Sequence, residues 1–262
     1  MRHPLRFLLL PAATLALAAF QTGCAARPPA SDKAAVAEYN QTNDPLEPTN
    51  RVFYAINEGL DTVILKPAAI AYKDVVPKPV RTHAHNVLAN LSTPVTLAND
   101  ILEAKPRRAG DSFMRLLVNT TVGLGGVFDV ATGWGWPAHD ADGGITLALW
   151  GLPNGPYLFL PVLGPSSPRN AGGLVADIGM DPLTWIGRGD VVSALDWSRY
   201  GLTALDTRAG LLDSLDKIKA QALDPYATVR SLYQQHRQYQ IQQVRSDDRA
   251  TVPAWFLQPS RP

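Results

Sequence analysis

The stretch from Gly143 to Pro168, GGITLALWGLPNGPYLFLPVLGPSSP, is the most informative part of this chain because it is apolar yet repeatedly interrupted. It contains no charged residue, and its apolar part, Ile145 to Leu163, is nearly long enough to cross a bilayer. That part includes Pro153, Pro156 and Pro161, and a proline inside a helix costs about 3 kcal/mol and one hydrogen bond. The stretch therefore predicts no single transmembrane helix. Either a soluble core buries it, or the protein presents it to lipid within one leaflet.

Composition sets broad limits on the function. The chain has 262 residues, enough for one substantial core or two small ones, and its apolar fraction of 46% is ordinary for a folded protein. The formal net charge is only +1. Because a nucleic-acid-binding protein needs a basic surface to neutralise phosphates, this near balance argues against a nucleic-acid partner.

The N-terminus has the organisation of a secretory signal. Arg2 and Arg6 form a basic start, and Phe7 to Phe20 is an uncharged apolar stretch that is too short for a comfortable membrane span. Cys24 follows closely and is the only cysteine of the chain. A lone cysteine excludes a disulfide or a thiolate metal site within one chain.

The residues around Cys24 resemble the bacterial lipobox, although Gln21 stands where leucine is usual. We expect residues 1–23 to be removed as a lipoprotein signal peptide and Cys24 to carry the lipid, including palmitate. Cleavage nearby, giving a soluble exported protein, is the alternative. Ala25 follows the cysteine in place of an aspartate, which favours sorting to the outer membrane. Two or more acyl chains make such an anchor effectively permanent.

The rest of the chain divides into three predicted parts. Residues 24–43 are mostly small and polar and are expected to form a flexible tether. Asp44 can cap a helix and Pro45 suits its first turn, so a helical domain is expected over residues 44–245. Residues 246–262 are polar and contain proline, and we expect a loose tail.

Apolar residues in this domain recur at three- and four-residue steps, which predicts helices. The expected helices lie around 53–64, over 80–102 with a possible kink at Pro94, around 113–118 ending at Gly123 to Gly126, over 191–212, and from Asp224-Pro225 onward. No run of alternating strands appears. The predicted fold class is all-α with few or no strands, and several helices have wider apolar faces than a small core needs.

Tryptophan is concentrated in one part of the sequence. Five of the six tryptophans, Trp134, Trp136, Trp150, Trp185 and Trp197, lie between positions 134 and 197. Tryptophan favours the bilayer interface because its ring is apolar and its N–H seeks a polar partner. Filling a core is the alternative, but the neighbouring charge-free stretch favours the interface.

Two motifs invite a ligand-binding interpretation and support it weakly. The run Gly123 to Gly126 suggests a phosphate loop, but Phe128 occupies the place of the third glycine, so a turn at a helix end is favoured. Asp140 and Asp142 have a trace of calcium-loop spacing, but Gly144 takes the next ligand position. A solvated turn is the favoured interpretation there.

The sequence offers little to support catalysis. His83 and His85 are two residues apart, so a helix would direct them to different faces and they would not easily share a metal. Ser166-Ser167 lies between prolines, outside any nucleophile elbow and with no evident base nearby. We therefore expect no enzyme, no metal and no cofactor, while noting that triads can assemble from distant residues.

An ordered series of motifs runs from Asn43 to Arg237. It comprises Asn43-Asp44-Pro45-Leu46-Glu47-Pro48 with Asn50-Arg51, Leu65-Lys66-Pro67, Asn119-Thr120-Thr121-Val122-Gly123-Leu124-Gly125-Gly126, Gly155-Pro156-Tyr157 with Leu160-Pro161 and Gly164-Pro165, Leu211-Leu212-Asp213 and Asp224-Pro225-Tyr226. In this order the motifs resemble the MlaA (VacJ) family of outer-membrane lipoproteins.

The resemblance implies a ring-like, multi-helix body around an amphipathic channel, anchored by lipid and embedded in the outer membrane from its periplasmic leaflet. It implies that phospholipids mislocalised in the outer leaflet pass through the channel to a soluble periplasmic carrier of the MlaC type. That carrier serves an inner-membrane ABC transporter, and a trimeric porin is the implied outer-membrane partner. The implied function is maintenance of lipid asymmetry. A structural lipoprotein without transport activity and an exported hydrolase are the alternatives.

Candidate lipid-contact residues follow from the same resemblance. Arg199 lies in a largely apolar segment, 191–205, at a basic position of the family, and we expect it to contact a lipid phosphate. Covering apolar neighbours with its stem is the alternative. Asn170 stands where the family usually has aspartate after an arginine. The further channel or lipid-contact candidates are Trp150, Tyr157 and Phe159.

The proline- and glycine-rich part of the opening stretch, Gly151–Gly164, is predicted to form a compact hairpin beside the channel. We expect this hairpin to gate or shape the pore, and a purely structural turn is the alternative. The candidate gating residues are Gly151, Pro153, Gly155, Pro156, Pro161 and Gly164.

Overall fold

The computed structural model describes residues 31, 44–185 and 190–246, without the side chains of 190–196. The expected signal peptide, Cys24, most of the tether, and the tail from 247 onward lie outside the described residues. The expectations about lipidation and cleavage concern those parts of the chain.

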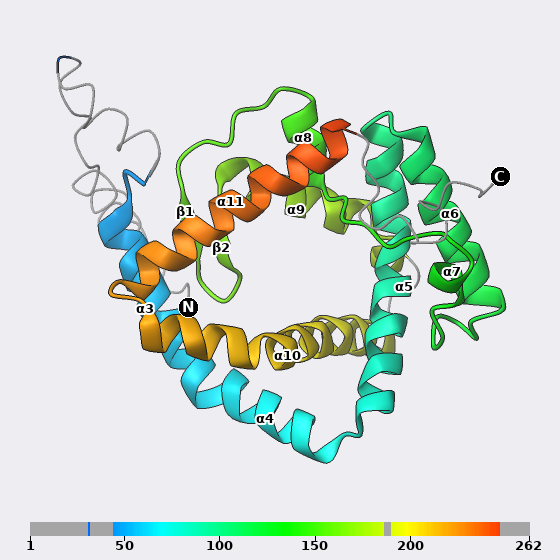
Figure 1. Ribbon diagram of the computed structural model, residues 1–262, viewed down its shortest axis with the longest axis horizontal. Helices are drawn as coiled ribbons and strands as arrows, with labels where there is room; N and C mark the ends of the chain where they lie inside the picture. Colours follow the sequence, from blue (N-terminus) through cyan, green and yellow to red (C-terminus); the bar gives the residue numbers. More distant parts are fainter. Residues whose placement is uncertain (1–30, 32–43, 186–189, 247–262) are drawn as a thin grey trace, which may run out of the picture. The chain divides into compact units, whose positions relative to one another are not determined.

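Helices make up most of the described chain, as the sequence predicted (Figure 1). They are α3 (Glu47–Leu60), the π-helix η1 (Asp61–Leu65), α4 (Lys66–Val75), α5 (Lys78–Leu102), α6 (Pro106–Thr121), α7 (Val130–Gly133), α8 (Gly143–Leu149), α9 (Pro168–Met180), the 3₁₀ helix η2 (Pro182–Thr184), α10 (Asp190–Gln221) and α11 (Pro225–Ser246). Two short strands, β1 (Leu158–Leu160) and β2 (Gly164–Ser166), form an antiparallel hairpin.

The helices predicted from periodicity are present, with differences at their ends. α5 continues through Pro94, and α10 runs beyond the expected end at Leu212 to Gln221. Asp224 caps α11 as expected, since the Ala227 N–H donates to Asp224 Oδ1 at 3.1 Å. α9 was not predicted, because it is rich in glycine, which is a poor helix former.

The glycine run after α6 closes the end of that helix, as predicted. Leu124, Gly125 and Gly126 have φ values of +54°, +72° and +94°. The Gly126 N–H donates to Asn119 O at 2.8 Å, and the Gly125 N–H donates to Thr120 O at 2.9 Å. Because these N–H groups satisfy helix carbonyls, they are not available to cradle a phosphate.

The chain forms two compact units. Unit 1 consists of Met1–Gly59 and Gly155–Pro168, and unit 2 consists of Leu60–Asn154 and Arg169–Pro262. The described part of unit 1 contains nearly all of α3 and the β1–β2 hairpin. The described part of unit 2 contains the remaining helices. The predicted helical domain, 44–245, spans both units.

Within unit 1, two asparagines of α3 hold the backbone of the hairpin. Asn50 Nδ2 donates to Tyr157 O at 3.0 Å, and Asn50 Oδ1 accepts from the Phe159 N–H at 2.9 Å. Asn57 makes the same kind of pair, donating to Leu160 O at 3.0 Å and accepting from the Val162 N–H at 2.7 Å. Seven residues are about two helical turns, so both amides lie on one face. The two asparagine side chains therefore hydrogen-bond to the hairpin backbone as a second neighbouring strand would.

Removing the buried amide should loosen the hairpin. Asn50→Ala leaves the Phe159 N–H and the Tyr157 carbonyl without that partner, and an unsatisfied buried group costs about 1–3 kcal/mol. We expect hydrogen exchange at the Phe159 amide to accelerate about 10- to 100-fold. Asn57→Ala, at a half-buried position, is the matched control and should give a smaller change. Equal exchange at Phe159 in Asn50→Ala and in the unmodified protein would contradict this account.

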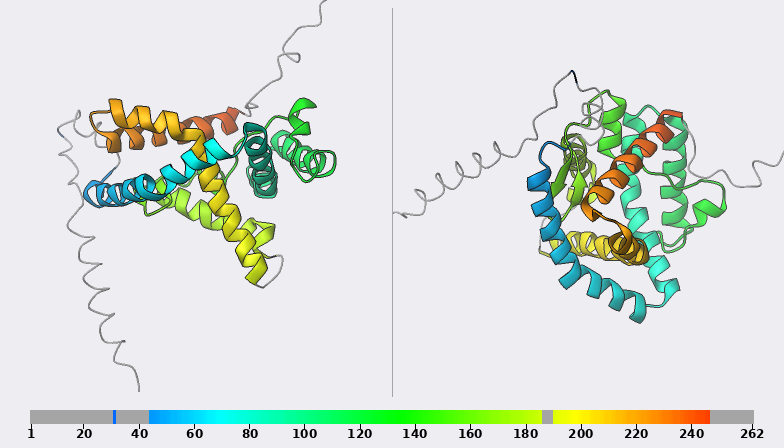
Figure 2. Two further views of the ribbon diagram at one scale, coloured as in Figure 1. Left: turned by 90° about the horizontal axis from the view of Figure 1, so that it is seen from below. Right: turned by 60° about the vertical axis from the view of Figure 1, so that its left-hand side comes forward.

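Within unit 2, helix contacts form a closed circuit. α5 contacts α8, α8 contacts α11, α11 contacts α10, and α10 contacts α5. α6 lies beside α5, and α4 packs along α10 (Figure 2). A small apolar cluster joins α4 and α10, and it consists of Ala69, Ala209 and Leu212 with Tyr72 and Leu205 packed against it.

Ion pairs reinforce the link between η1 and α10. The Arg208 guanidinium donates to both oxygens of Asp61, at 2.5 and 2.9 Å, and Lys219 Nζ lies 3.1 Å from Asp61 Oδ2. The hydrogen bond from Arg208 is the main reason that the pKa of Asp61 is below its ordinary value. The widened turn of the π-helix therefore carries an acid that two cations of α10 bind.

Candidate functional site

The distribution of polar and apolar side chains is unusual for a soluble protein. Among the described side chains, seventeen polar or charged residues are buried, against thirteen apolar ones. Large apolar residues lie at the surface, and Val63, Val75, Val162 and Val175 are between 69% and 77% exposed. Soluble proteins bury most of their aliphatic side chains, and a broad exposed apolar surface indicates contact with lipid or a partner.

The exposed tryptophans agree with an interfacial location. Trp134, Trp150, Trp185 and Trp197 are each more than half exposed, so none of these four fills a core. The indole N–H of Trp150 donates to Leu102 O at 3.0 Å, and that of Trp185 donates to Gly179 O at 2.9 Å. Each ring therefore has a satisfied polar edge and an exposed apolar face, as residues of the bilayer interface do.

The charge-free stretch is broken in the way its prolines predicted. It forms the short helix α8, a loop, and the hairpin whose tip residues Val162 and Leu163 are 76% and 65% exposed. α8 belongs to unit 2 and the hairpin to unit 1. Over residues 44–185 and 190–246, no helix is both long enough and apolar enough to cross a membrane.

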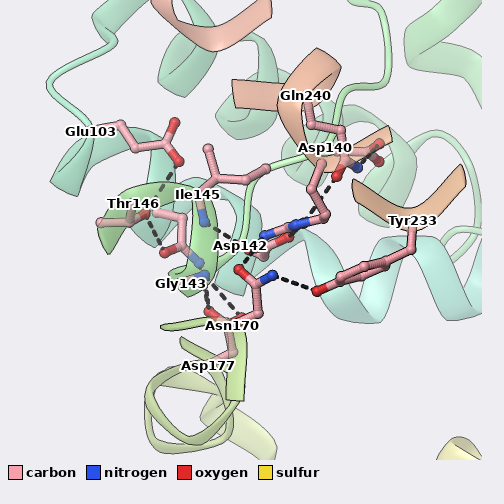
Figure 3. A network of polar contacts seen from close by, with 12 residues as sticks. Glu103, Asp140, Asp142, Gly143, Ile145, Thr146, Asn170, Asp177, Tyr233 and Gln240 are labelled. Atoms are coloured by element: carbon pink, nitrogen blue, oxygen red, sulfur yellow. Dashed lines mark hydrogen bonds and ion pairs between the residues drawn. The ribbon is translucent and has the colours of Figure 1, made fainter. Parts of the chain in front are cut away.

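A polar network surrounds the first turn of α8 in unit 2 (Figure 3). Asp142 caps the helix, because its Oδ1 accepts from the Ile145 N–H at 2.9 Å. Both of its oxygens also accept from the Arg237 guanidinium, at 2.6 and 2.9 Å. Burial alone would raise the pKa of Asp142, but the bonds and charge of Arg237 outweigh burial and hold it below its ordinary value. Asp142 is therefore a helix cap held in an ion pair, and its interpretation as part of a solvated turn was wrong, whereas Asp140 is exposed.

The network continues from Arg237 into two other segments. Arg237 Nη2 donates to Asn170 Oδ1 at 3.1 Å, and the Asn170 amide donates to the Tyr233 hydroxyl at 2.5 Å. Arg237 Nη1 also donates to Gln240 Oε1 at 2.9 Å, and Gln240 donates in turn to Asp140 Oδ2 at 2.9 Å. These bonds join α11 to the start of α9 and to the loop before α8.

On the other side of α8, the network reaches α5. The Gly143 N–H lies 2.9 and 3.0 Å from the two oxygens of Asp177, and Asn99 Nδ2 donates to Asp177 Oδ1 at 2.7 Å. Thr146 Oγ1 donates to Asn99 Oδ1 at 2.7 Å and lies 3.2 Å from Glu103 Oε1. Burial raises the pKa of Asp177. Burial and the negative charge of Asp100 raise the pKa of Glu103 to about 7.

Glycines allow α8 and α9 to meet backbone to backbone. A Cβ at Gly173 would lie 2.1 Å from the Gly144 nitrogen, and a Cβ at Gly143 would lie 2.5 Å from the Gly173 carbonyl oxygen. Both distances are below any real contact of a Cβ atom. The approach places Asp177 and Asn170 of α9 within reach of the first turn of α8.

The raised pKa of Glu103 predicts a pH dependence of stability. Between pH 4.5, the ordinary pKa of this carboxyl, and about pH 7, Glu103 is protonated in the folded protein but deprotonated in the unfolded chain. The stability from this proton is complete below about pH 4.5 and is lost as the pH rises through 7. At pH 8 Glu103→Gln should therefore be about 1–2 kcal/mol more stable than the unmodified protein, after allowance for solvent screening.

Urea unfolding in one detergent at pH 4.5, 6 and 8 measures this difference. The two proteins should be nearly equal in stability at pH 4.5 and should diverge towards pH 8. Asp74→Asn, at an exposed position on α4, is the control and should show no divergence. If the stability of Glu103→Gln varied with pH just as that of the unmodified protein does, the Glu103 carboxyl would not titrate near pH 7.

One cluster carries the side chains of a hydrolase without the required arrangement. Ser112 Oγ donates to Asp100 Oδ2 at 2.6 Å and lies 3.2 Å from His139 Nε2. The same Nε2 lies 2.8 Å from Asp100 Oδ2. In a catalytic triad the acid and the serine bind opposite nitrogens of the imidazole. Here one nitrogen faces both, and the serine proton is directed to the acid, so this cluster does not activate a nucleophile.

The two histidines of α5 have separate partners. His83 Nδ1 lies 2.9 Å from Val127 O, and His85 Nδ1 lies 2.8 Å from Asp206 Oδ2 of α10. In the described part of the chain, no group of three or more His, Cys, Asp or Glu side chains is arranged to hold a metal ion.

Three of the predicted lipid-contact residues lie in unit 2. Arg199 forms an ion pair with Asp181 and lies 3.1 Å from the Tyr200 hydroxyl, with a side chain only 10% exposed. Trp150 is 57% exposed. Asn170 belongs to the network around α8. The contact of each with lipid stays a prediction.

The other two lipid-contact candidates are inside unit 1. Tyr157 is 1% exposed and Phe159 is 5% exposed, and the Phe159 ring packs edge-on against Tyr54 with centroids 5.5 Å apart. Their contact with lipid stays a prediction, and it would require the hairpin to move away from α3.

The candidate gating residues fall into three structural settings. Gly151, Gly155 and Gly164 have φ values of +90°, +73° and +84°, a region that favours glycine. Pro153 and Pro156 lie in the loop that precedes β1. Pro161 begins the turn of the hairpin, which is shorter than predicted because the strands start only at Leu158. A gating role stays a prediction.

Sequence reasoning missed most of the network around α8. An aspartate followed by glycines at the start of an apolar run is a helix-capping pattern, and this signal would have identified Asp142. Arg237, its partner, lies 95 positions further along the chain. Asn99 and Asp177 are 78 positions apart, and no local pattern marks them.

Comparison with known proteins agrees with this architecture. The model of the MlaA lipoprotein family matches residues 42–240. The "Intermembrane phospholipid transport system lipoprotein MlaA" of Escherichia coli (strain K12) is 36% identical over 202 residues, which cover 75% of this chain and 78% of the relative. The protein of the same name from Haemophilus influenzae is 34% identical over 227 residues, 84% of this chain and 85% of the relative.

A solved structure is also similar. A chain described under "Structural basis for maintenance of bacterial outer membrane lipid asymmetry" has a TM-score of 0.67 and 34% identity, and the match covers 76% of this chain and 98% of that chain. The family model thus accounts for most of the sequence, and the relatives exceed 30% identity over most of their own length. The chain belongs to the MlaA lipoprotein family.

Proposed function

We propose that the chain removes mislocalised phospholipids from the outer leaflet of the outer membrane and so maintains lipid asymmetry. The single observation that carries this proposal is the large number of exposed apolar side chains, which accompanies many buried polar ones. Membership of a family whose relatives are named as phospholipid transport lipoproteins agrees with it. The work is movement of lipid and requires no bond chemistry.

The lipid path in this proposal is an amphipathic channel within the helical body. Such a channel needs polar groups for the headgroup and apolar walls for the acyl chains. The closed circuit of α5, α8, α11 and α10 supports the idea, because it combines the polar network at α8 with exposed apolar residues such as Leu202 and Leu211 on α10. The exposed tryptophans favour a position in the interface of one leaflet.

The proposal includes an anchor and partners. Lipidated Cys24 would hold the protein in the periplasmic leaflet of the outer membrane. A soluble periplasmic carrier of the MlaC type would receive the lipid and pass it to an inner-membrane ABC transporter, and a trimeric porin would be the partner within the outer membrane. No nucleotide site is needed in the chain itself.

The hairpin has a gating role in the proposal. The asparagine bonds from α3 fix one position of the hairpin, and opening would require these bonds to break. A disulfide between cysteines placed at positions 57 and 162 should lock the hairpin and stop transport, because the Asn57 side chain already reaches the Val162 backbone N–H. Reduction should restore it. Full transport by the oxidised protein would remove the gating role and leave the transport function intact.

Arg199 is the proposed contact for a lipid phosphate. Because Asp181 already binds its guanidinium, a phosphate would have to compete with that carboxylate. Arg199→Lys keeps a positive charge beside Asp181 but loses the planar guanidinium, so it should impair transport while the protein stays folded. Normal barrier function in that variant would count against the contact.

The test of the function uses a host strain that lacks the protein. A membrane-impermeant amine reagent labels aminophospholipids exposed on the cell surface, and this label should rise in the deletion strain and return to normal with the unmodified chain. A structural lipoprotein without transport activity would leave the labelling unchanged as long as the porin is present.

A further inference from the structure

A pocket of about 260 Å³ opens in unit 2 where the end of α8, the start of α9 and the last turns of α11 meet. Arg169 and Arg245 both line it, together with the amide side chains of Gln238 and Gln242. Leu152 and Ile241 form apolar parts of the same wall. The pocket thus combines two cations, two amides and an apolar face.

The guanidinium of Arg169 is incompletely satisfied. Its Nε is buried and has no hydrogen-bond partner within the described residues, and its Nη1 reaches the Leu152 carbonyl oxygen only at 3.4 Å. The neighbouring cation, Arg237, is already bound to Asp142. Burial, followed by the positive charge of Arg237, lowers the pKa of Arg169. A half-buried cation with a buried, unsatisfied N–H is stabilised by a negative partner.

Other features add positive charge around the pocket. Arg169 lies in the first turn of α9, where the helix dipole places further partial positive charge. Arg245 is exposed, and the ammonium group of Lys105 lies 3.4 Å from its carbonyl oxygen. Within the described residues, neither Arg169 nor Arg245 forms an ion pair with a carboxylate. Asp142 and Tyr233 are the nearby groups that favour the charged form of Arg169, and Asp142 is bound to Arg237.

We propose that this pocket binds a phosphate ester, with Arg169 and Arg245 as the cationic contacts and Gln238 and Gln242 as amide donors. Guanidinium groups suit phosphate because their planar N–H groups match its oxygens. Leu152 and Ile241 give the ester an apolar surface on one side, as the glycerol and upper acyl carbons of a phospholipid require. This inference rests on the proposed function, since it assigns a headgroup site to the transported lipid.

Binding of a short-chain phospholipid tests the site. Calorimetry or fluorescence titration of the full mature protein in one detergent would use dihexanoylphosphatidylglycerol, inorganic phosphate and dihexanoylglycerol as three separate probes. Arg169→Gln and Arg245→Gln should each weaken the phospholipid at least 10-fold. Arg107→Gln, at an exposed position on α6 outside the pocket, is the matched control and should bind as the unmodified protein does. A thermal melt of each variant establishes that it is folded.

The probes separate the sources of the phosphate. Strong binding of the phospholipid with weak binding of inorganic phosphate and of dihexanoylglycerol assigns the site to a lipid headgroup. Equal binding of inorganic phosphate, lost in the same two variants, assigns it to free phosphate.

If the unmodified protein binds the phospholipid and both folded variants bind it with the same affinity, the phospholipid does not bind in this pocket. The proposed function fails in a different way, with no phospholipid binding by the unmodified protein.

Discussion

Gly173→Ala should destabilise unit 2 by about 3 kcal/mol, at the upper end of the usual cost of overpacking. The added methyl would lie 2.1 Å from the Gly144 nitrogen and 2.4 Å from the Gly143 carbonyl carbon. These are backbone atoms of α8, so no side-chain rotation can relieve the overlap. The two helices would have to separate, which would stretch the bonds from Asp177 to the first turn of α8.

The adjacent glycine provides a matched control on the same helix. A Cβ at Gly172 would meet nothing within 4 Å, and alanine is a better helix former than glycine by about 1 kcal/mol. Gly172→Ala should therefore leave stability unchanged or raise it slightly. Urea unfolding of the mature protein in a fixed detergent measures both variants. Equal stability of the two would contradict the backbone contact between α8 and α9.

Arg237→Gln should cost about 2–3 kcal/mol, because it leaves the partly buried carboxylate of Asp142 without its cation. It also removes the bonds that Arg237 makes to Asn170 and Gln240. The lowered pKa of Asp142 adds a pH dependence. The stability from this ion pair is present above the ordinary aspartate pKa of 3.8 and is lost as the pH falls through the lower folded value.

A double-mutant cycle with Asp142→Asn isolates the pair. The losses in unfolding free energy of the two single variants should sum to about 1–2 kcal/mol more than the loss in the double variant. Lys73→Gln is the control, because its ion pair with Asp213 is long at 3.5 Å and largely exposed, so it should change stability by less than about 0.5 kcal/mol. Strict additivity in the cycle would show that the Asp142–Arg237 contact contributes nothing to folding.

Much of the fold was predictable from local patterns. The spacing of apolar residues predicted α5, α6, α10 and α11. This periodicity of 3–4 residues is the same whether the apolar face of a helix contacts a protein core or lipid. The prolines correctly excluded a transmembrane helix from the stretch that begins at Gly143. α9 escaped prediction because Gly172, Gly173 and Gly179 weaken its helical pattern. Gly173 allows the backbone of α9 to pack directly against α8.

The site was far less predictable, because its partners are distant in sequence. Asn50 resembles an ordinary helix residue until β1, more than 100 positions later, is placed against it. Asp142 was assigned to a solvated turn because Arg237 lies 95 positions away. The wide apolar faces did not reveal how many apolar side chains are exposed, since periodicity shows that two faces differ but not which one is buried.

If this chain carries phospholipid, the lipid should remain bound to the mature protein during purification. The protein would be purified from membranes in a mild detergent, beside an unrelated outer-membrane lipoprotein treated in the same way. Quantitative mass spectrometry of the extracted lipids should find about one phospholipid or more per chain, and far less with the control. Phospholipid no more abundant than in the control would mean that the chain does not carry lipid.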